Sequence, residues 1–339
     1  MNVALERVEL RFATPVATAY GQLRARELVE LRLTGEDGLV GRGEAAPLER
    51  YDGVSIEDVR TALVAYRPIL ERAGAGSSPG DLLAACRTRI DLPQALAAVD
   101  LALWDLAGRR AGRPVCELLS SAPARSIEVN ATITAGDRQG AATAAAAAAR
   151  AGYRCVKLKV GIGDDAGRVA AVRAAIGPDV ALRLDANGAW SLDEAQRMIE
   201  ALAPAGIEMV EEPVRGLTAT RMLRDLVAVR VAIDESAALA GALAGGVADA
   251  VCLKIGRCGG ISGLLAAAAL VRSSGAEAYI ASTFDGPIGI AAGLHAAAAL
   301  APLPPCGLAT LALFDGVDDP FSVVDGAIGV PDGPGLLGR

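Results

Sequence analysis

Charged side chains recur at the ends of successive apolar runs in the second half of this 339-residue chain. These runs end, in chain order, at Lys157 with Lys159, then at Asp185, Glu211, Asp234 and Lys254. From Lys159 the steps are 26, 26, 23 and 20 residues, each about the length of one strand–helix unit. An unpaired buried charge costs on the order of several kcal/mol, so five consecutive charged units predict one shared site rather than separate loop salt bridges.

The three carboxylates predict a site for a hard divalent cation. Asp185, Glu211 and Asp234 have no histidine or cysteine close by in the sequence. Ligation by oxygen alone favours Mg²⁺, with Mn²⁺ as the alternative. Glu212 directly follows Glu211, so on a strand the two face opposite sides and only one can be a ligand; the same choice applies to Asp234 and Glu235.

The lysines predict an acid–base function beside that metal. Lys157 and Lys159 are two residues apart, so both ammonium groups lie on one face of a strand. A free lysine has a pKa of about 10.4, but a second ammonium and a metal ion both lower that pKa. A lysine in this setting can remove a proton from carbon. Lys254 lies beyond the metal in this arrangement, as a second acid or base or as a cation facing the substrate.

The order of expected elements predicts how these side chains are brought together. Residues 1–45 alternate as strands, and 55–73, 80–88 and 93–110 have helical spacing. From residue 127, short apolar runs alternate with helices, which predicts a parallel (β/α) barrel with the charges at its carboxyl-terminal mouth; an open doubly wound sheet is the alternative. The residues after 312 read as loops with one short strand. The expected barrel strands are 128–134, 154–160, 180–186, 206–212, 229–235, 248–255, 277–283 and 306–311.

Composition excludes several classes of protein. Lys and Arg total 33 and Asp and Glu 40, so the net charge of −7 argues against a nucleic-acid or anionic-membrane partner. Six scattered cysteines without a CxxC motif disfavour a zinc site or a disulfide framework and suit a reducing cytosol. No apolar run reaches the ~18 residues of a membrane helix, and we expect a cytoplasmic protein. His295, in an alanine-rich helix, is expected to be a packing residue.

Five ordered motifs resemble the enolase superfamily, in its muconate-lactonizing subgroup. They are KLKVG (157–161), RLDANGAW (183–190), VEEP (210–213), IDES (233–236) and LKIGRCGG (253–260), and 102–119 resembles part of the capping domain. The resemblance implies an α/β fold: a modified (β/α)₇β barrel of the TIM type over residues 121–311, with an α+β capping domain formed by 1–120 and the tail 312–339. It further implies Mg²⁺ ligands at Asp185, Glu211 and Asp234, a general base at Lys159, and Lys254 on the opposite face.

Within the subgroup, the end of the barrel indicates the substrate. Dipeptide epimerases usually carry an Asp-x-Asp pair at the eighth strand, and residues 305–310 have none. CGLATLALF and DDPFSVVDGAIGVP are instead similar to o-succinylbenzoate synthases. This implies Mg²⁺-dependent syn-dehydration of 2-succinyl-6-hydroxy-2,4-cyclohexadiene-1-carboxylate through an enediolate, on the way to menaquinone. Within the superfamily, the alternatives are a muconate cycloisomerase and a dipeptide or N-acylamino acid epimerase or racemase. Outside it, the alternatives are a Schiff-base aldolase and a non-catalytic binding protein.

A small-molecule carboxylate is the expected partner, and a homo-oligomer is left open. Two capping loops, near Tyr20 and Tyr51, are expected to close over the barrel and exclude water. Further expected substrate contacts are Asn187, Ser282, Thr283 and Asp285.

Overall fold

The amino-terminal part of the chain is an antiparallel sheet covered by helices. The computed structural model describes residues 1–18, 21–74 and 76–338. Strands β1 (Asn2–Thr18), β2 (Gly21–Thr34) and β3 (Val40–Ala45) lie in that order. They are followed by α1 (Glu49–Asp52), α2 (Ile56–Glu71), α3 (Pro79–Arg89), α4 (Pro93–Ala111) and α5 (Val115–Leu119). The strands of the first hairpin are longer than expected. The predicted substrate contact Tyr20 lies outside the described residues.

Close packing of α4 on β3 holds this part together. Gly41 and Gly43 face α4, and a Cβ at either position would collide with the backbone carbonyl of Ala102 or Ala98. Two glycines on one strand face therefore allow helix and sheet to approach more closely than side chains would. The helices form where the sequence predicted them, and Ser55 caps α2 in a capping box with Asp58.

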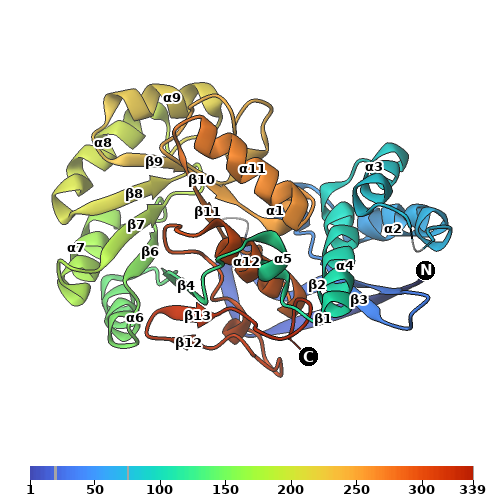
Figure 1. Ribbon diagram of the computed structural model, residues 1–339. Coiled ribbons are helices and arrows are strands. Elements are labelled where there is room, and N and C mark those ends of the chain that lie inside the picture. The colour runs from blue at the N-terminus through green and yellow to red at the C-terminus, as the bar shows by residue number, and fades with distance from the viewer. Residues whose placement is uncertain (19–20, 75, 339) are drawn as a thin grey trace.

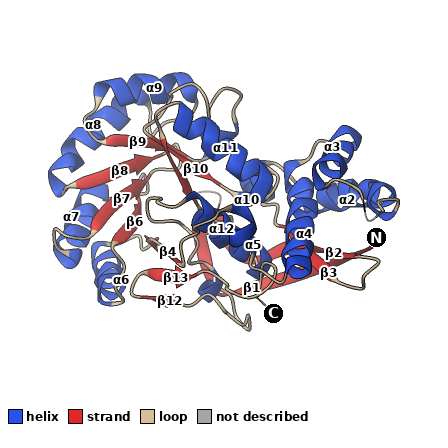
Figure 2. Ribbon diagram, viewed as in Figure 1, coloured by secondary structure: helices blue, strands red, loops and turns tan. Residues whose placement is uncertain are grey.

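The second part is a parallel barrel, which confirms the predicted fold class. Seven strands lie in the order β11-β10-β9-β8-β7-β6-β5, with helices on their outer side (Figures 1 and 2). The eighth position is short: Cys306 bridges Val129 and Gly307 bridges Ala281, which joins the two edges of the sheet. The strands are β5 (Ala131–Ile133), β6 (Cys155–Lys159), β7 (Ala181–Asp185), β8 (Ile207–Glu211), β9 (Arg230–Ile233), β10 (Ala250–Leu253) and β11 (Glu277–Ile280).

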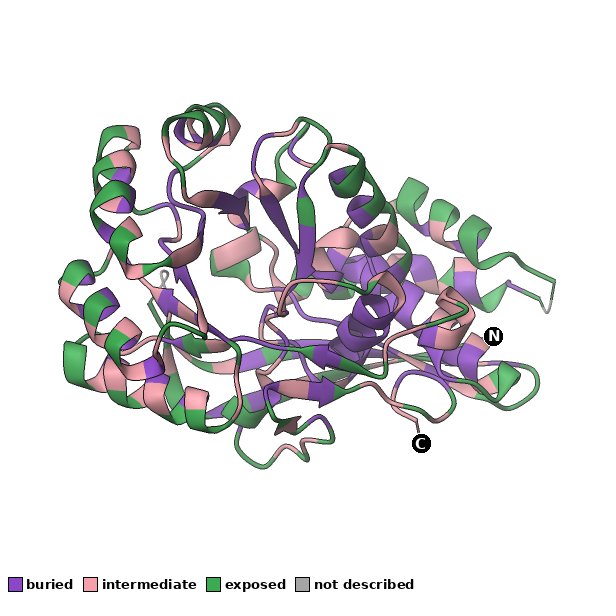
Figure 3. Cartoon of the chain, turned by 60° about the vertical axis from the view of Figure 1, so that its left-hand side comes forward, coloured by how far each residue is buried: buried purple, intermediate pink, exposed green. Residues whose placement is uncertain are grey.

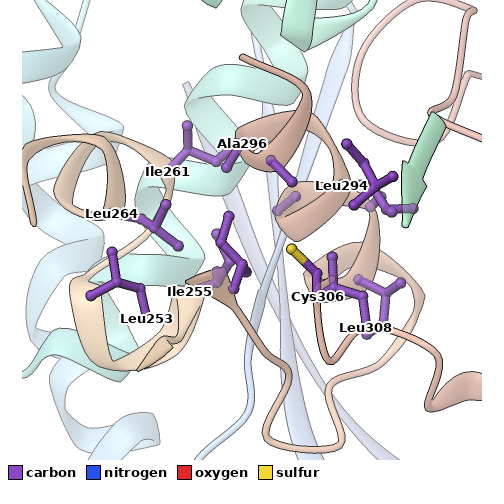
Figure 4. Packing of buried hydrophobic residues seen from close by; sticks show 14 of the residues in the cluster. Leu253, Ile255, Ile261, Leu264, Leu294, Ala296, Cys306 and Leu308 are labelled. Carbon is purple, nitrogen blue, oxygen red and sulfur yellow. The ribbon is translucent and has the colours of Figure 1, made fainter. Parts of the chain in front are cut away.

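The barrel helices bury one face each, except the last, in which residues 288–298 are all buried. They are α6 (Arg138–Arg150), α7 (Asp165–Ile176), α8 (Leu192–Leu202), α9 (Leu217–Leu226), α10 (Ile255–Cys258), α11 (Ile261–Ser273) and α12 (Pro287–Leu300), with short 3₁₀ turns at Ala203–Ala205, Glu235–Ala238 and Leu311–Leu313. Buried residues concentrate in the strands and on the inner sides of the helices (Figure 3). Leu294 of α12 and Leu308 pack in one core cluster with Leu253 and Leu264 (Figure 4). No helix of the described chain is long and apolar enough to cross a membrane.

The carboxyl-terminal tail contacts both parts of the molecule. It contains two short strands, β12 (Val323–Val324) and β13 (Ala327–Gly329), where the sequence predicted one. Strand β13 pairs with β4 (Ser126–Glu128) at the start of the barrel segment. The amide of Leu336 donates to Asp105 of α4. We therefore propose that the tail belongs with residues 1–120 as one capping domain beside the barrel segment 121–311.

His295 is a buried packing residue, as predicted. Its Nδ1 accepts a hydrogen bond from the amide of Cys116, and its Nε2 lies 2.9 Å from the carbonyl oxygen of Leu336. The ring therefore joins α12 to α5 and to the tail. Burial lowers the pKa of His295 from 6.5 to about 4.

This pKa predicts a loss of stability in mild acid. Between pH 6.5 and 4 the unfolded chain binds a proton at His295 that the folded chain does not, so the free energy of unfolding falls as pH falls. From pH 7 to pH 5 the loss due to this group is about 2 kcal/mol. Urea unfolding of the wild type and of His295→Gln at both pH values measures it. The variant should have the shallower pH dependence, and equal slopes would contradict the prediction.

Candidate active site

The lysines and carboxylates meet because their strands are neighbours in register. Lys159 is paired with Asp185 across β6 and β7, and Asp185 with Glu211 across β7 and β8. Asp234 directly follows β9, and Lys254 directly follows β10. All of them therefore lie at the carboxyl-terminal mouth of the barrel.

The charges form a buried network. Lys157 Nζ lies 3.0 Å from Asp185 Oδ2 and 2.7 Å from Glu211 Oε1. Lys159 Nζ lies 3.5 Å from Asp185 Oδ2 and donates to Asn187 Oδ1. On the other side, Lys254 Nζ donates to Asp234 Oδ2 at 2.8 Å. Asp185, Glu211 and Asp234 are 3 %, 1 % and 5 % exposed, so these charges are compensated by one another rather than by solvent.

Burial and pairing shift the pKa values of this network in opposite directions. Burial alone would raise the pKa of Asp185, but the ammonium groups of Lys157 and Lys159 bring it down to about 2. Burial opposes the charge of Lys157, yet Asp185 and Glu211 raise its pKa above that of free lysine. The two carboxylates that contact the Lys157 ammonium act against the lowering that the sequence argument expects from a second ammonium and a metal ion. Burial raises the pKa of Glu211, and Asp185 and Asp234 add to the rise while Lys157 opposes it.

The adjacent acidic residues at the end of β8 are oriented differently from those after β9. Glu211 points to Lys157, whereas Glu212 turns away and accepts hydrogen bonds from the amides of Asp234 and Ser236, as strand alternation predicted. Strand β9 ends at Ile233, so alternation does not continue, and Asp234 and Glu235 both line the cavity.

A cavity of about 370 Å³ opens above these side chains. Its floor is the ionic network, and its far wall is neutral: it is formed by the end of β1 from Thr14 to Thr18, by Leu48, by Phe284 and by Leu313. The eighth barrel position contributes Gly307, Ala309 and Thr310, none of which is charged.

Four of the predicted substrate contacts, Tyr51, Asn187, Ser282 and Thr283, line this cavity. Asp285, in the loop after β11, does not: it is 5 % exposed, and its carboxylate accepts a hydrogen bond from the amide of Thr283 in the same loop. Its expected contact with substrate is therefore not supported by its position.

Tyr51 reaches from the capping segment to the floor of the cavity. Its hydroxyl donates to Asp234 Oδ1 at 2.7 Å and accepts from Arg257 Nη1 at 2.5 Å. Its ring centroid lies 4.4 Å from Lys254 Nζ, a cation–π contact. Tyr51 thus lines the cavity and also contacts the charged residues of the predicted site.

Sequence reasoning missed three side chains of the site. Tyr279 donates to Glu211 Oε2 at 2.6 Å, and the side-chain atoms of Cys252, Glu211 and Asp234 lie within 4.8 Å of one another. Arg257 holds the hydroxyl of Tyr51. Cys252 lies two residues before Lys254 on the same strand face, a spacing that could have indicated it; no comparable pattern marked Tyr279 or Arg257.

Comparison with known proteins agrees with this architecture. Residues 1–120 match the mandelate racemase/muconate lactonizing enzyme amino-terminal domain, and residues 140–337 match the enolase carboxyl-terminal domain-like family. The chain belongs to the enolase superfamily, in its muconate-lactonizing subgroup. It is thus a member of a family of enzymes.

Several members of this superfamily are similar over most of their length. A hydrophobic dipeptide epimerase of Roseobacter litoralis is 33 % identical over 86 % of both chains. An o-succinylbenzoate synthase of Thermobifida fusca is 38 % identical over 63 % of this chain and 70 % of its own. An N-succinyl-L-Arg/Lys racemase of Bacillus cereus is 26 % identical over 87 % of this chain and 83 % of its own.

A solved structure adds the metal. The dipeptide epimerase of Enterococcus faecalis, in complex with Mg and the dipeptide L-Leu-L-Tyr, superposes with a TM-score of 0.89 over 99 % of this chain and 98 % of its own, at 26 % identity. Together with the converging carboxylates of Glu211 and Asp234, this agreement confirms the prediction of a divalent-metal site.

Proposed function

We propose that this enzyme removes the proton α to a substrate carboxylate, with Lys159 as the base. Lys159 ends the second barrel strand, β6, and Lys254 follows the sixth, β10. In a barrel of eight positions these two lie across from each other, and both line the cavity. A substrate between them would present its α carbon to one lysine and its opposite face to the other.

The donor set fits Mg²⁺. Asp185, Glu211 and Asp234 would hold it, because they offer buried carboxylate oxygens. The negative charge of these carboxylates already attracts the ammonium groups of the lysines. When bound, Mg²⁺ would offset the negative charge that builds up on the substrate carboxylate during proton removal. Lys157 offsets the charge of Asp185 and Glu211, and Tyr279 orients Glu211.

The residues of this chain then perform a simple proton transfer. Asn187 holds the Nζ of Lys159 beside the cavity, and in its neutral form this amine takes the α proton. In a dehydration the same proton is returned to the leaving hydroxide, so that a C–H and a C–O bond break, a C=C bond forms and water departs. Lys254 stays paired with Asp234 and against Tyr51, as a cation facing the developing negative charge.

The neutral wall at the eighth barrel position is the main structural evidence on the class of substrate. Gly307, Ala309 and Thr310 offer no counter-charge for the ammonium of a free dipeptide. This disfavours a free dipeptide and leaves substrates that have no ammonium at that end. We therefore propose o-succinylbenzoate synthesis as the main activity, and the 38 % identity to the Thermobifida fusca synthase also supports it.

A second candidate is racemization of an N-succinylamino acid. Epimerases and racemases outnumber the synthase among the relatives described above, so the comparisons support that class better than the synthase. An N-succinyl group resembles the succinyl arm of the cyclohexadiene: both carry a neutral carbonyl, an amide in one and a ketone in the other, followed by a distal carboxylate. The opposed lysines also suit proton exchange on both faces.

One set of assays separates these reactions. Purified enzyme with Mg²⁺ is given the cyclohexadiene substrate, N-succinylamino acids and free dipeptides, and product formation and α-proton exchange in D₂O are followed. We expect turnover of the cyclohexadiene substrate. If N-succinylamino acids also react, Lys254→Arg should exchange the α proton on one face only. Exchange with free dipeptides alone would overturn the proposal.

A further inference from the structure

A buried arginine joins the two segments that form the far wall of the cavity. Arg26 of β2 is 3 % exposed. Its Nη1 donates to the carbonyl of Pro47 at 2.7 Å and its Nη2 to that of Ala46 at 3.0 Å. Its Nε lies 3.2 Å from the carbonyl oxygen of Thr283 and 3.3 Å from that of Phe284. One guanidinium therefore holds four backbone carbonyls that are distant in the sequence.

Both segments lead directly into the cavity. Ala46 and Pro47 connect β3 to Leu48 and Tyr51, which line it from the capping side. Thr283 and Phe284 line it from the loop after β11. Phe284 has a φ of 55°, a left-handed conformation that a non-glycine residue keeps only when its surroundings impose it. The bond from Arg26 to its carbonyl is one such constraint.

Acidic groups around Arg26 extend this connection to α12. Glu44 of β3 accepts from the amide of Gly286 at 2.7 Å, at the start of α12. A Cβ at Gly286 or Gly289 would collide with the Glu44 carboxylate, so the two glycines make room for it. Asp285 lies beside the same carboxylate, and its charge, after burial, raises the pKa of Glu44 to about 8. Arg26, Glu44 and Asp285 form one buried cluster between the capping sheet and the barrel.

We propose that Arg26 is a positioning residue that sets substrate selectivity by tying residues 46–51 of the capping segment to residues 282–286 of the barrel. In these two segments Leu48, Thr283 and Phe284 belong to the neutral wall of the cavity, whereas Tyr51 reaches the ionic network at Asp234 and Lys254. This inference rests on the proposed function for its substrates. Arg26 bonds to Ala46, Pro47, Thr283 and Phe284, whereas the hydroxyl of Tyr51 is held separately by Asp234 and Arg257. Loss of Arg26 should therefore weaken substrate binding more than it slows the proton transfer.

The test compares Arg26→Lys and Arg26→Met with a matched control. Arg173 also donates to four backbone carbonyls, those of Gly177, Val180, Ala205 and Gly206, but it contacts neither segment of the cavity wall. Arg173→Met should lower stability while leaving KM unchanged. For Arg26→Met we expect KM to rise about ten-fold or more with kcat changed less than about three-fold. A lysine cannot reach four carbonyls with a planar fork, so Arg26→Lys should lie in between.

Hydrogen exchange gives a readout that needs no substrate. In unliganded Arg26→Lys, amides of 46–51 and of 282–286 should both exchange faster, and in Arg173→Lys neither should. Faster exchange of both segments with an unchanged KM would overturn the role in selectivity, and unchanged exchange would overturn the connection itself. If the wild type turns over none of the assayed substrates, the proposed function fails, whereas the exchange result still decides the connection.

Discussion

Replacing Lys159 with alanine should lower kcat for α-proton removal by about 10³-fold. Lys159 Nζ lines the cavity and is held by Asn187 beside Asp185. No other lysine on this side of the cavity replaces it, because Lys157 Nζ is occupied by Asp185 and Glu211 at 3.0 and 2.7 Å. The loss should be measured as product formation and as α-proton exchange in D₂O with Mg²⁺ present.

Lys159→Arg is the matched control for this prediction. Arginine keeps the positive charge beside Asp185, but its pKa is too high for it to act as a base at neutral pH. This variant should therefore fold and respond to Mg²⁺ like the wild type and still be inactive. Near-normal turnover in Lys159→Ala would exclude Lys159 as the base. If Lys159→Arg lost its response to Mg²⁺, the inactivity of that variant would come from a disturbed metal site rather than from the missing base.

The periodic part of the site could be predicted from sequence because a parallel barrel repeats its geometry. Each strand places its last residue at the same mouth, so charges spaced by 20 to 26 residues had to meet. The same regularity separated Glu211 from Glu212 by strand alternation. It failed one residue beyond β9, where Asp234 and Glu235 both reach the cavity because the strand has ended.

What the sequence could not predict depends on contacts between segments far apart in the chain. Arg26 is 257 residues from Thr283, and Tyr51 is 183 from Asp234, so no local pattern indicates either pairing. Asp285 illustrates the opposite case: its place in the loop after β11 suggested a substrate contact, but it is buried and interacts with the charges of Arg26 and Glu44. Which side of a loop faces a cavity is decided by what packs behind it.

Replacing Glu211 with glutamine should abolish the response to Mg²⁺. Glu211 is 1 % exposed and accepts from Lys157 and Tyr279, so an amide of the same shape keeps the packing but loses the charge that a divalent cation needs. We expect Mg²⁺ affinity to fall by more than about 100-fold, since even indirect partners of metal ligands contribute 10–100-fold. For the wild type, Mg²⁺ at about 100 times its Kd should add about 2.7 kcal/mol to the free energy of unfolding.

Thermal unfolding with and without Mg²⁺ measures this difference. Glu208→Gln, at the other end of β8 and paired with Arg183, is the control. It removes a charge from the same strand and weakens a partly exposed ion pair with the buried Arg183, so it should lower the unfolding temperature but keep the rise on adding Mg²⁺. A Glu211→Gln protein that is stabilised by Mg²⁺ as much as the wild type would place the cation elsewhere. Loss of the rise in Glu211→Gln alone would tie the metal to the same carboxylate that Lys157 and Tyr279 hold in place.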